Sequence, residues 1–232
     1  MKINHVSSGQ QWWISLELVK LHCRAFWYWS ASGTSLANEQ SPAAFELFIQ
    51  WIYTRIYVEK TSTVVAFGST TSDDISLTCA STSKGNGRMA WSIKAAILAW
   101  DMGRYLGCSE FQNYAMGRLF AAFSRSILPS LSLTANVFAF AQGQQHKESA
   151  GGGPASELRT FFEDIIVRNW GDANIVYHGD QGKWSEMLSQ SATFRNKFLV
   201  GTMQPLEKRR EKVMELKSYL VAPYSKDIED GV

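Results

Sequence analysis

The sequence predicts an α+β fold, in which a small sheet of short strands is flanked by helices and followed by a mainly helical C-terminal extension. Two observations carry this prediction. Short apolar runs near the N-terminus alternate with turn-forming residues, as short strands do. From residue 41 onwards, apolar side chains recur at helical spacing behind residues that favour helix starts. We therefore expect a first domain over residues 1–125, with a polar insertion at about 61–88, and a helical extension over 126–232.

The N-terminal elements are predicted to be short. Residues 3–6 and 11–14 have strand-like sequences, and the Ser-Ser-Gly-Gln run between them favours a hairpin. A short helix should follow Ser15, and a second helix should continue through Trp29. After a polar loop, we expect a minimal strand at residues 35–37.

The segment 41–53 carries the strongest helix signal in the chain. Ser41 is a favoured N-cap residue, and Pro42 takes the first helical position, where its missing N–H costs nothing. One broad apolar face is formed by Phe45, Leu47, Phe48, Trp51 and Ile52.

A polar stretch separates this helix from a predicted helical hairpin. Ser, Thr, Gly and Asp dominate residues 61–88, so we expect an exposed, partly disordered loop there. The hairpin should comprise residues 93–105 and a helix that begins at the capping box Ser109-Glu110-Phe111-Gln112. In its first helix, the side chains expected to face inward are Ile93, Ala96, Ile97 and Trp100. Further helices are predicted at 134–141, from Ser156, at 184–200 and at 207–220.

Composition and charge argue against several classes of protein. The 232 residues are 45% apolar and 19% charged, which allows a sizeable core, and the net charge of +2 is too small to favour nucleic acid as a partner. The one dense basic run is Lys208-Arg209-Arg210, which Glu207 and Glu211 flank. We interpret it as a solvated helix face with i,i+4 ion pairs. A nuclear, transcription-linked factor whose Arg209-Arg210 helix touches DNA is an alternative.

The cysteines and the apolar segments bear on the compartment. Cys23, Cys79 and Cys108 are odd in number and far apart, which argues against a disulfide framework and a structural zinc site. The N-terminus has no apolar stretch typical of a secretory signal, and no window of about 20 residues suits a membrane span. We expect an intracellular protein, cytoplasmic or nuclear, without a membrane partner.

Motifs for catalysis are missing from the sequence. There is no GxSxG elbow, P-loop or HExxH motif, so we predict no catalytic, metal-binding or cofactor-binding residues. Two places bring together residue types used by hydrolases or metal sites: His22-Cys23 and His178-Gly179-Asp180. An enzyme with an unrecognised site is therefore the other alternative, and its marker would be a deep pocket that gathers His178, Asp180 and a further carboxylate.

Aromatic residues are concentrated near the N-terminus. Phe26 is expected in the core, but six aromatics within eighteen positions can hardly all point inward. Adjacent strand residues face opposite sides of a sheet, so one residue of the pair Trp12 and Trp13 should face outward. An exposed aromatic patch is typical of a protein-binding surface. The predicted partner-binding residues are Trp12, Trp13, Trp27, Tyr28 and Trp29.

Three segments carry family-like patterns. Residues 14–26 contain an apolar strand-to-helix run, and residues 41–54 contain Phe-Glu-Leu-Phe-Ile-Gln-Trp-Ile-Tyr-Thr. Residues 98–116 contain Trp-Asp-Met-Gly-Arg-Tyr-Leu-Gly, followed by Phe-Gln-Asn-Tyr-Ala-Met. In order and spacing these segments resemble the BTB/POZ domain of small fungal proteins, over about residues 2–125. Ser156 to Ile166 resembles the helical region that commonly follows it.

The resemblance implies a protein-interaction function without catalysis. It suggests an adaptor in a larger complex or a self-associating protein. Animal members often form swapped dimers through an N-terminal helix and strand, and we do not expect that route, because the chain starts almost at its first strand. Animal members bind cullin-3 through an apolar-x-Glu motif. Residues 30–36 contain no Glu, so the resemblance gives cullin-3 no direct support as a partner.

Overall fold

The computed structural model describes residues 1–5, 9–23, 35–36, 41–58, 65–66, 88–89, 91–124, 133–143 and 156–223. The chain divides into two compact units. Unit 1 comprises Met1–Thr61, Ser92–Leu119 and Leu220–Val232, and unit 2 comprises Ser62–Trp91 and Phe120–Tyr219. Each unit combines helices with a small sheet, so the predicted α+β class is confirmed. The predicted boundary at residue 125 divides the chain once, whereas the two units interleave along it.

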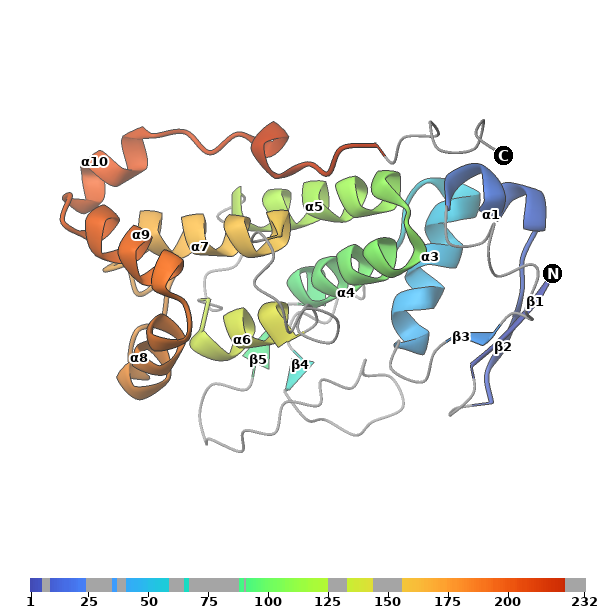
Figure 1. The fold of residues 1–232 in the computed structure, drawn as a ribbon, viewed down its shortest axis with the longest axis horizontal. Coiled ribbons are helices and arrows are strands. Elements are labelled where there is room, and N and C mark those ends of the chain that lie inside the picture. The colour runs from blue at the N-terminus through green and yellow to red at the C-terminus, as the bar shows by residue number, and fades with distance from the viewer. Residues whose placement is uncertain are drawn as a thin grey trace, which may run out of the picture. The chain divides into compact units, whose positions relative to one another are not determined.

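The sheet of unit 1 begins with the predicted hairpin. Strand β1 (Lys2–His5) pairs antiparallel with β2 (Gln11–Trp13), and the short β3 (Ser35–Leu36) pairs parallel with β1 on its other side. The strand order is therefore β2-β1-β3, and β2 lies at an edge (Figure 1). Lys2 lies opposite Trp13 and Ile3 opposite Trp12.

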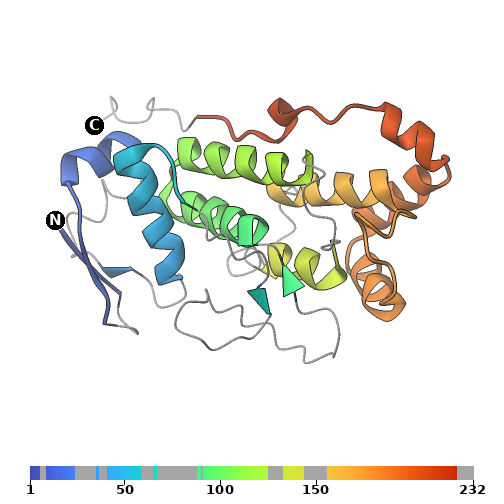
Figure 2. The same cartoon turned by 180° about the vertical axis from the view of Figure 1, so that it is seen from behind.

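Two serine-capped helices follow these strands in the part of unit 1 that is described. Helix α1 (Leu16–His22) begins after Ser15, whose Oγ accepts a hydrogen bond from the Leu18 N–H. Helix α3 (Pro42–Thr54) begins after Ser41 in the same way, with Pro42 in its first turn, as predicted. Figure 2 shows α3 beside the strands from behind. The predicted second helix, which would continue through Trp29, lies outside the described residues.

The core of unit 1 is largely aromatic. The buried face of α3 contains the predicted apolar side chains, and Phe48 and Trp51 lie with ring centroids 5.4 and 5.1 Å from Phe111 of α5 (Ser109–Ser124). Trp12 from β2 contacts the other end of this row, edge-on to Phe45 at 5.0 Å. These contacts join the sheet, α3 and α5 through one set of rings.

Helix α4 (Trp91–Leu106) buries the four side chains predicted to face inward, Ile93, Ala96, Ile97 and Trp100. Every residue from Ile93 to Gly103 is buried, and the buried set includes Lys94 and Asp101 as well as the apolar side chains. The four predicted inward positions are thus confirmed, and burial extends around the helix beyond them. Close approach to α5 is one cause, because a Cβ on Gly103 would lie 2.7 Å from the Gln112 side chain.

Unit 2 packs helices around a second aromatic core. Its sheet pairs β4 (Val65–Ala66) with β5 (Arg88–Met89), two short strands at the borders of the predicted polar insertion. The rest of residues 61–88 lies outside the described residues. Helix α6 (Ala135–Gly143) and helix α7 (Glu157–Asn169) match the predicted positions, and Ser156 caps α7. Among the described residues of unit 2, the fully buried rings are Phe138, Phe161, Phe162 and Phe194, and Trp184 is also buried.

The predicted helix at 184–200 is two helices in the structure. Helix α8 (Gln181–Gln190) begins after Asp180, and α9 (Ala192–Thr202) begins after Ser191. Ser191 has extended backbone angles, and its Oγ accepts a hydrogen bond from the Phe194 N–H at 3.2 Å. The chain breaks here because Ser191 acts as an N-cap rather than as an interior residue.

The predicted helix at 207–220 is also interrupted. Helix α10 (Leu206–Glu211) ends after Glu211, and a single 3₁₀ turn, η1 (Leu216–Tyr219), follows. The carbonyl oxygens of Arg210 and Lys212 accept hydrogen bonds from the Arg168 guanidinium. These carbonyls are thereby satisfied outside a helical ladder, and the backbone becomes extended at Lys212.

Candidate functional site

The outer face of the β1–β2 hairpin holds the clearest candidate for a binding surface. Trp13 is 73% exposed, whereas its neighbour Trp12 is half-buried against Phe45. The two rings thus lie on opposite sides of the sheet, as predicted from their adjacency in a strand. Lys2, opposite Trp13 on β1, has its Nζ 5.9 Å from the centre of the Trp13 ring. This cation–π contact helps to hold the exposed ring in one orientation.

The remaining predicted partner-binding residues cannot be added to this face. Trp27, Tyr28 and Trp29 lie outside the described residues. The hairpin itself is anchored at two points, one in β1 and one just after β2. On one side Ile3 is fully buried, and on the other the Ser15 N–H donates to the Tyr53 hydroxyl of α3 at 3.1 Å. Trp13 is therefore presented from a strand that is fixed to the core.

His22, singled out from the sequence, lies in a charged cluster at one end of α1. Arg55 Nη2 lies 2.5 Å from His22 Nε2, and Glu110 Oε2 lies 3.1 Å from Nδ1. An arginine can only donate, so Nε2 accepts, and Nδ1 faces the carboxylate of Glu110. The sequence indicated neither Arg55 nor Glu110 as a partner of His22, because the three residues come from separate segments.

The backbone of Arg55 explains how this cluster is held. Arg55 ends α3 in the left-handed region, with φ of 63°, and its N–H donates to the Trp51 carbonyl at 2.6 Å. Its guanidinium lies 4.9 Å from the centre of the Trp51 ring. Glycine usually takes such a position, and here the contacts of the arginine side chain offset the backbone strain. With Nε2 occupied by Arg55, His22 ties α1 to α3 and α5 and leaves no ring nitrogen for a substrate.

Cys23, next to His22, has the character of a core thiol. Burial raises its pKa well above the ordinary value, and a hydrogen bond with Cys108 and the charge of Glu110 act in the same direction. Because the thiolate is the reactive form, this environment disfavours nucleophilic chemistry.

The second sequence candidate, His178-Gly179-Asp180, belongs to a helix cap. Asp180 Oδ1 accepts a hydrogen bond from the Lys183 N–H at the start of α8. His178 is half-buried against the Trp170 ring, and its Nδ1 lies 3.2 Å from the Val176 carbonyl. The ring of Tyr177 lies over Gly179, where a Cβ would come within 2.4 Å of the hydroxyl. These contacts give each residue a structural role in the turn.

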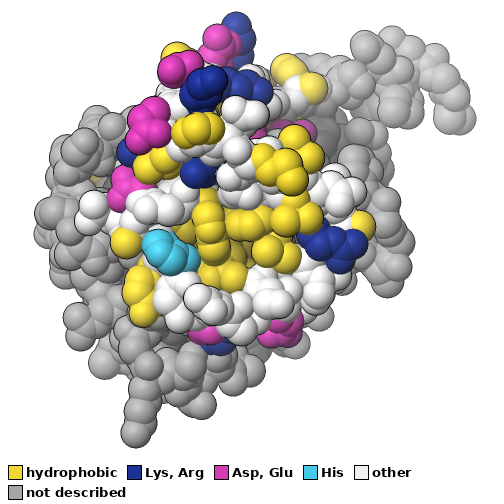
Figure 3. All heavy atoms as spheres, turned by 90° about the vertical axis from the view of Figure 1, so that its left-hand side faces the viewer, with side chains coloured by type: hydrophobic (Ala, Val, Ile, Leu, Met, Phe, Trp, Pro, Cys, Tyr) yellow, Lys and Arg dark blue, Asp and Glu magenta, His cyan; other side chains and the backbone are white. Residues whose placement is uncertain are grey.

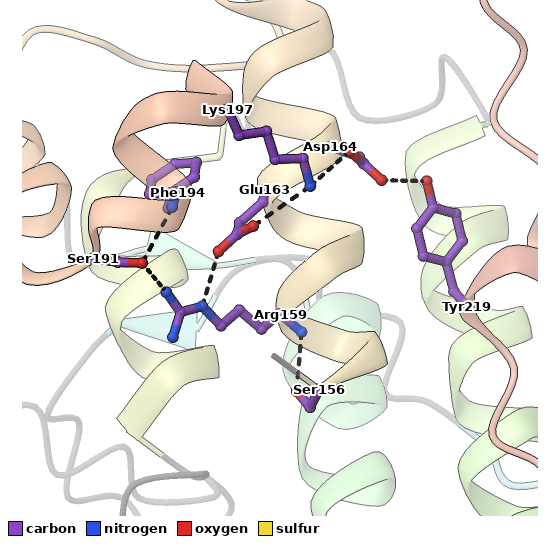
Figure 4. Close-up of polar contacts among 8 residues, drawn as sticks. All are labelled: Ser156, Arg159, Glu163, Asp164, Ser191, Phe194, Lys197 and Tyr219. Carbon is purple, nitrogen blue, oxygen red and sulfur yellow. Dashed lines mark hydrogen bonds and ion pairs between the residues drawn. The ribbon is translucent and has the colours of Figure 1, made fainter. Parts of the chain in front are cut away.

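A charged network in unit 2 is centred on the buried carboxylate of Glu163 (Figure 4). Arg159 Nε donates to it at 2.8 Å, and Lys197 lies 3.4 Å away. Arg159 also donates to Ser191 Oγ at 2.6 Å, and so joins α7 to the start of α9. On the next residue, Asp164 pairs with Lys197 at 2.9 Å and accepts from the Tyr219 hydroxyl at 2.8 Å. The network therefore ties α9 and η1 to α7, and these contacts are typical of a structural role.

The basic run 208–210 is only partly the solvated face that the sequence predicted. Lys208 is exposed, but Arg209 donates to the carbonyl of Val167 and, at 2.7 Å, to that of Trp170, at the end of α7. Arg210 donates to the Asn169 side chain and, at 2.5 Å, to Asp172, and this lowers the pKa of Asp172. Glutamate and basic residues in this run are at most three positions apart, so no i,i+4 pair can form, and Arg209 and Arg210 instead cap α7.

A second exposed apolar surface lies on α9. Its exposed positions are Ala192, Thr193, Arg195, Asn196, Leu199 and Val200, and the exposed Met203 follows the helix. The last three are large, exposed apolar side chains. Figure 3 looks onto the end of unit 2 that carries α8, α9 and α10, and it shows hydrophobic side chains gathered between basic ones.

The described side chains and helices also bear on metal binding and on membrane crossing. Within the described ranges, no group of three or more His, Cys, Asp and Glu side chains could hold a metal ion. No helix in the described part of the chain combines the length and apolar character that a membrane crossing requires.

In comparisons with known proteins, no family model, curated protein or solved structure matches the chain.

Proposed function

We propose that this protein is a non-enzymatic, BTB/POZ-like interaction protein that self-associates or acts as an adaptor, with the outer face of its N-terminal hairpin as a contact surface. The observation that carries the proposal is the position of Trp13. A large aromatic ring is 73% exposed on a strand whose other face packs into the core. Tryptophan is enriched among residues that dominate binding energy, because it buries a large area at a low cost in conformational entropy.

The order of elements supports the BTB/POZ-like part of the proposal. The chain runs through a hairpin, α1, the short parallel strand β3 and the aromatic helix α3 before it reaches the helical pair α4 and α5. This is the order in which the family-like segments occur. The Phe-Glu-Leu-Phe segment supplies the buried face of α3, and Phe111 of the third segment packs against it.

The polar side chains singled out from the sequence are engaged in structural contacts, which agrees with a function in binding rather than in catalysis. His22 is held between Arg55 and Glu110, and Asp180 caps α8. The guanidinium groups of Arg209 and Arg210 are engaged by the end of α7, so they are not presented as free phosphate ligands.

Affinity capture tests the proposal directly. Differently tagged copies of the full chain are co-expressed in cells of the source organism, and captured proteins are compared for wild type, Trp13→Ala and Val58→Ala. Val58 is a matched control, because it is also 73% exposed in unit 1 but follows α3 rather than lying on the hairpin. We expect Trp13→Ala alone to lose a captured partner, whether foreign or a second copy. Equal capture by all three proteins would exclude this face as the contact surface.

A further inference from the structure

We infer that the outer edge of β2, which pairs with no other strand among the described residues, pairs with β2 of a second copy, antiparallel about a two-fold axis that passes beside Trp12. This inference rests on the proposed function and names the partner at the hairpin. It follows from the directions of the backbone hydrogen-bonding groups in β2, and from the side chains and charges beside them.

The hydrogen-bond pattern of the hairpin shows which groups of β2 point outward. Met1 and Ile14 form a doubly bonded pair, with Ile14 N donating to Met1 O at 3.0 Å and Met1 N donating to Ile14 O at 2.6 Å. Bonded and non-bonded pairs alternate along an antiparallel ladder. The register therefore makes Trp12 a bonded position, whereas Gln11 and Trp13 are non-bonded positions. The N–H and C=O groups of Gln11 and Trp13 consequently point away from β1, towards the edge.

This edge is self-complementary. In an antiparallel pair centred on Trp12, Gln11 of one copy lies opposite Trp13 of the other. Both residues carry outward N–H and C=O groups, so each such pair exchanges both hydrogen bonds, and the two-fold axis repeats the exchange. Trp12 then lies opposite Trp12 at a non-bonded position. A register shifted by one residue would bring outward groups opposite inward ones. A register shifted by two would pair Gln11 or Trp13 with residues outside β2, so only the arrangement centred on Trp12 pairs all four outward groups within the two strands.

The side chains on both faces fit the same arrangement. At a non-bonded position the side chains of opposite residues are close, so the two half-buried Trp12 rings would cover part of each other's remaining surface. On the outer face, Trp13 of one copy lies beside the exposed Gln11 of the other. The apolar inner face then continues from Phe45 across both Trp12 rings.

Charge favours a second copy over a charged partner. Residues 6–16 contain no Asp, Glu, Lys, Arg or Pro. Proteins commonly protect an exposed strand edge with a lysine or a proline on that strand, and β2 has neither. Lys2 of each copy lies on β1, opposite Trp13 of the same copy. In the paired arrangement that Trp13 lies opposite Gln11 of the other copy, so the two lysines are never opposite each other. Two neutral edges therefore meet without opposed like charges.

A proline substitution separates edge pairing from other contacts. Gln11→Pro removes an outward N–H without removing a hydrogen bond inside the hairpin, and edge strands tolerate proline at such positions. Gln11→Ala is the matched control, since it loses the side chain and keeps the N–H. We expect light scattering over a concentration series to show a weak dimer for wild type and Gln11→Ala. Gln11→Pro should raise the dimer dissociation constant by about tenfold to a hundredfold, because each copy loses a donor and leaves an acceptor unpaired.

Amide exchange of the wild-type chain gives a second measurement, which does not depend on how the proline variant folds. The Gln11 and Trp13 amides should exchange more slowly at high protein concentration, whereas the Trp12 amide, bonded within the hairpin, should change little.

Two outcomes would overturn the inference. One is a dimer that Gln11→Pro and Gln11→Ala affect equally, with amide exchange at Gln11 and Trp13 independent of concentration. The other is a monomer at all concentrations. If that monomer still captures a foreign partner in a Trp13-dependent way, the proposed function stands and only the second copy as partner is wrong.

Discussion

Trp12 and Trp13 offer a direct test of the hairpin, because adjacent residues of the same type should behave in opposite ways. Replacing a fully buried tryptophan with alanine costs about 3–5 kcal/mol. Trp12 is half-buried, which gives about 2 kcal/mol, and its edge-on contact with Phe45 at 5.0 Å adds about 0.5–1 kcal/mol. We therefore expect Trp12→Ala to lower the free energy of unfolding by about 2–3 kcal/mol.

Trp13→Ala should have a much smaller effect on stability. Its side chain is 73% exposed, so little apolar surface returns to water when it is removed. The contact with Lys2 is solvent-exposed and contributes about 0.5 kcal/mol. We expect a loss below about 1 kcal/mol, together with the loss of partner capture described above.

Urea unfolding followed by circular dichroism, at protein concentrations that keep the chain monomeric, measures both changes. Wild type provides the reference slope, and an unchanged slope shows that the variants unfold from the same folded state. A loss for Trp13→Ala as large as that for Trp12→Ala would refute the reasoning. It would mean that the hairpin register differs by one residue, since such a slip exchanges the two faces of β2.

Further predictions concern unit 2 and can be checked by the same unfolding measurements. Arg209→Ala should lower the free energy of unfolding by about 2 kcal/mol, because the substitution removes the cap of α7. Lys208→Ala, which changes the exposed neighbouring residue, should lower it by less than about 0.5 kcal/mol. Equal effects of the two substitutions would contradict the capping role. Glu163→Gln should cost about 2–3 kcal/mol, since it leaves Arg159 and Lys197 without their buried carboxylate, and an unchanged midpoint would argue against the network. Burial and the hydrogen bond to Asp164 raise the pKa of Tyr219 above its ordinary value of 10.0, so its contribution to stability is complete below about pH 10 and is lost as the pH rises further. Tyr219→Phe should remove this part of the alkaline loss, and parallel pH profiles for both proteins would contradict it.

Local signals predicted the starts of several helices correctly. Ser15, Ser41 and Ser156 each accept a hydrogen bond from the N–H three residues later, as N-cap residues do. The hairpin was also predictable, because the turn sequence and the apolar runs lie within a dozen residues. Strand alternation was sufficient to place Trp12 and Trp13 on opposite faces.

Interruptions and charged partners were not predictable in this way. The sequence around Ser191 continues the apolar spacing of α8 into α9, so the break becomes visible only when the Ser191 hydroxyl caps α9 and accepts from Arg159. The basic run at 208–210 has glutamates at helical spacing, which suggested local ion pairs. In the structure, Arg209 and Arg210 reach groups about 40 residues earlier in the chain.

The sequence alone thus determined where most helices and strands begin, and that one of the two hairpin tryptophans faces outward, whereas the structure showed that this residue is Trp13. Both features depend on interactions between residues that are close in the sequence, so the local sequence is sufficient to predict them. The tertiary structure decided that His22 lies between Arg55 and Glu110, that α4 is buried on all sides, and that the edge of β2 carries outward hydrogen-bonding groups beside an exposed ring. These features depend on which distant segments pack together and on the register of strand pairing, and neither is set by the local preference of any one segment.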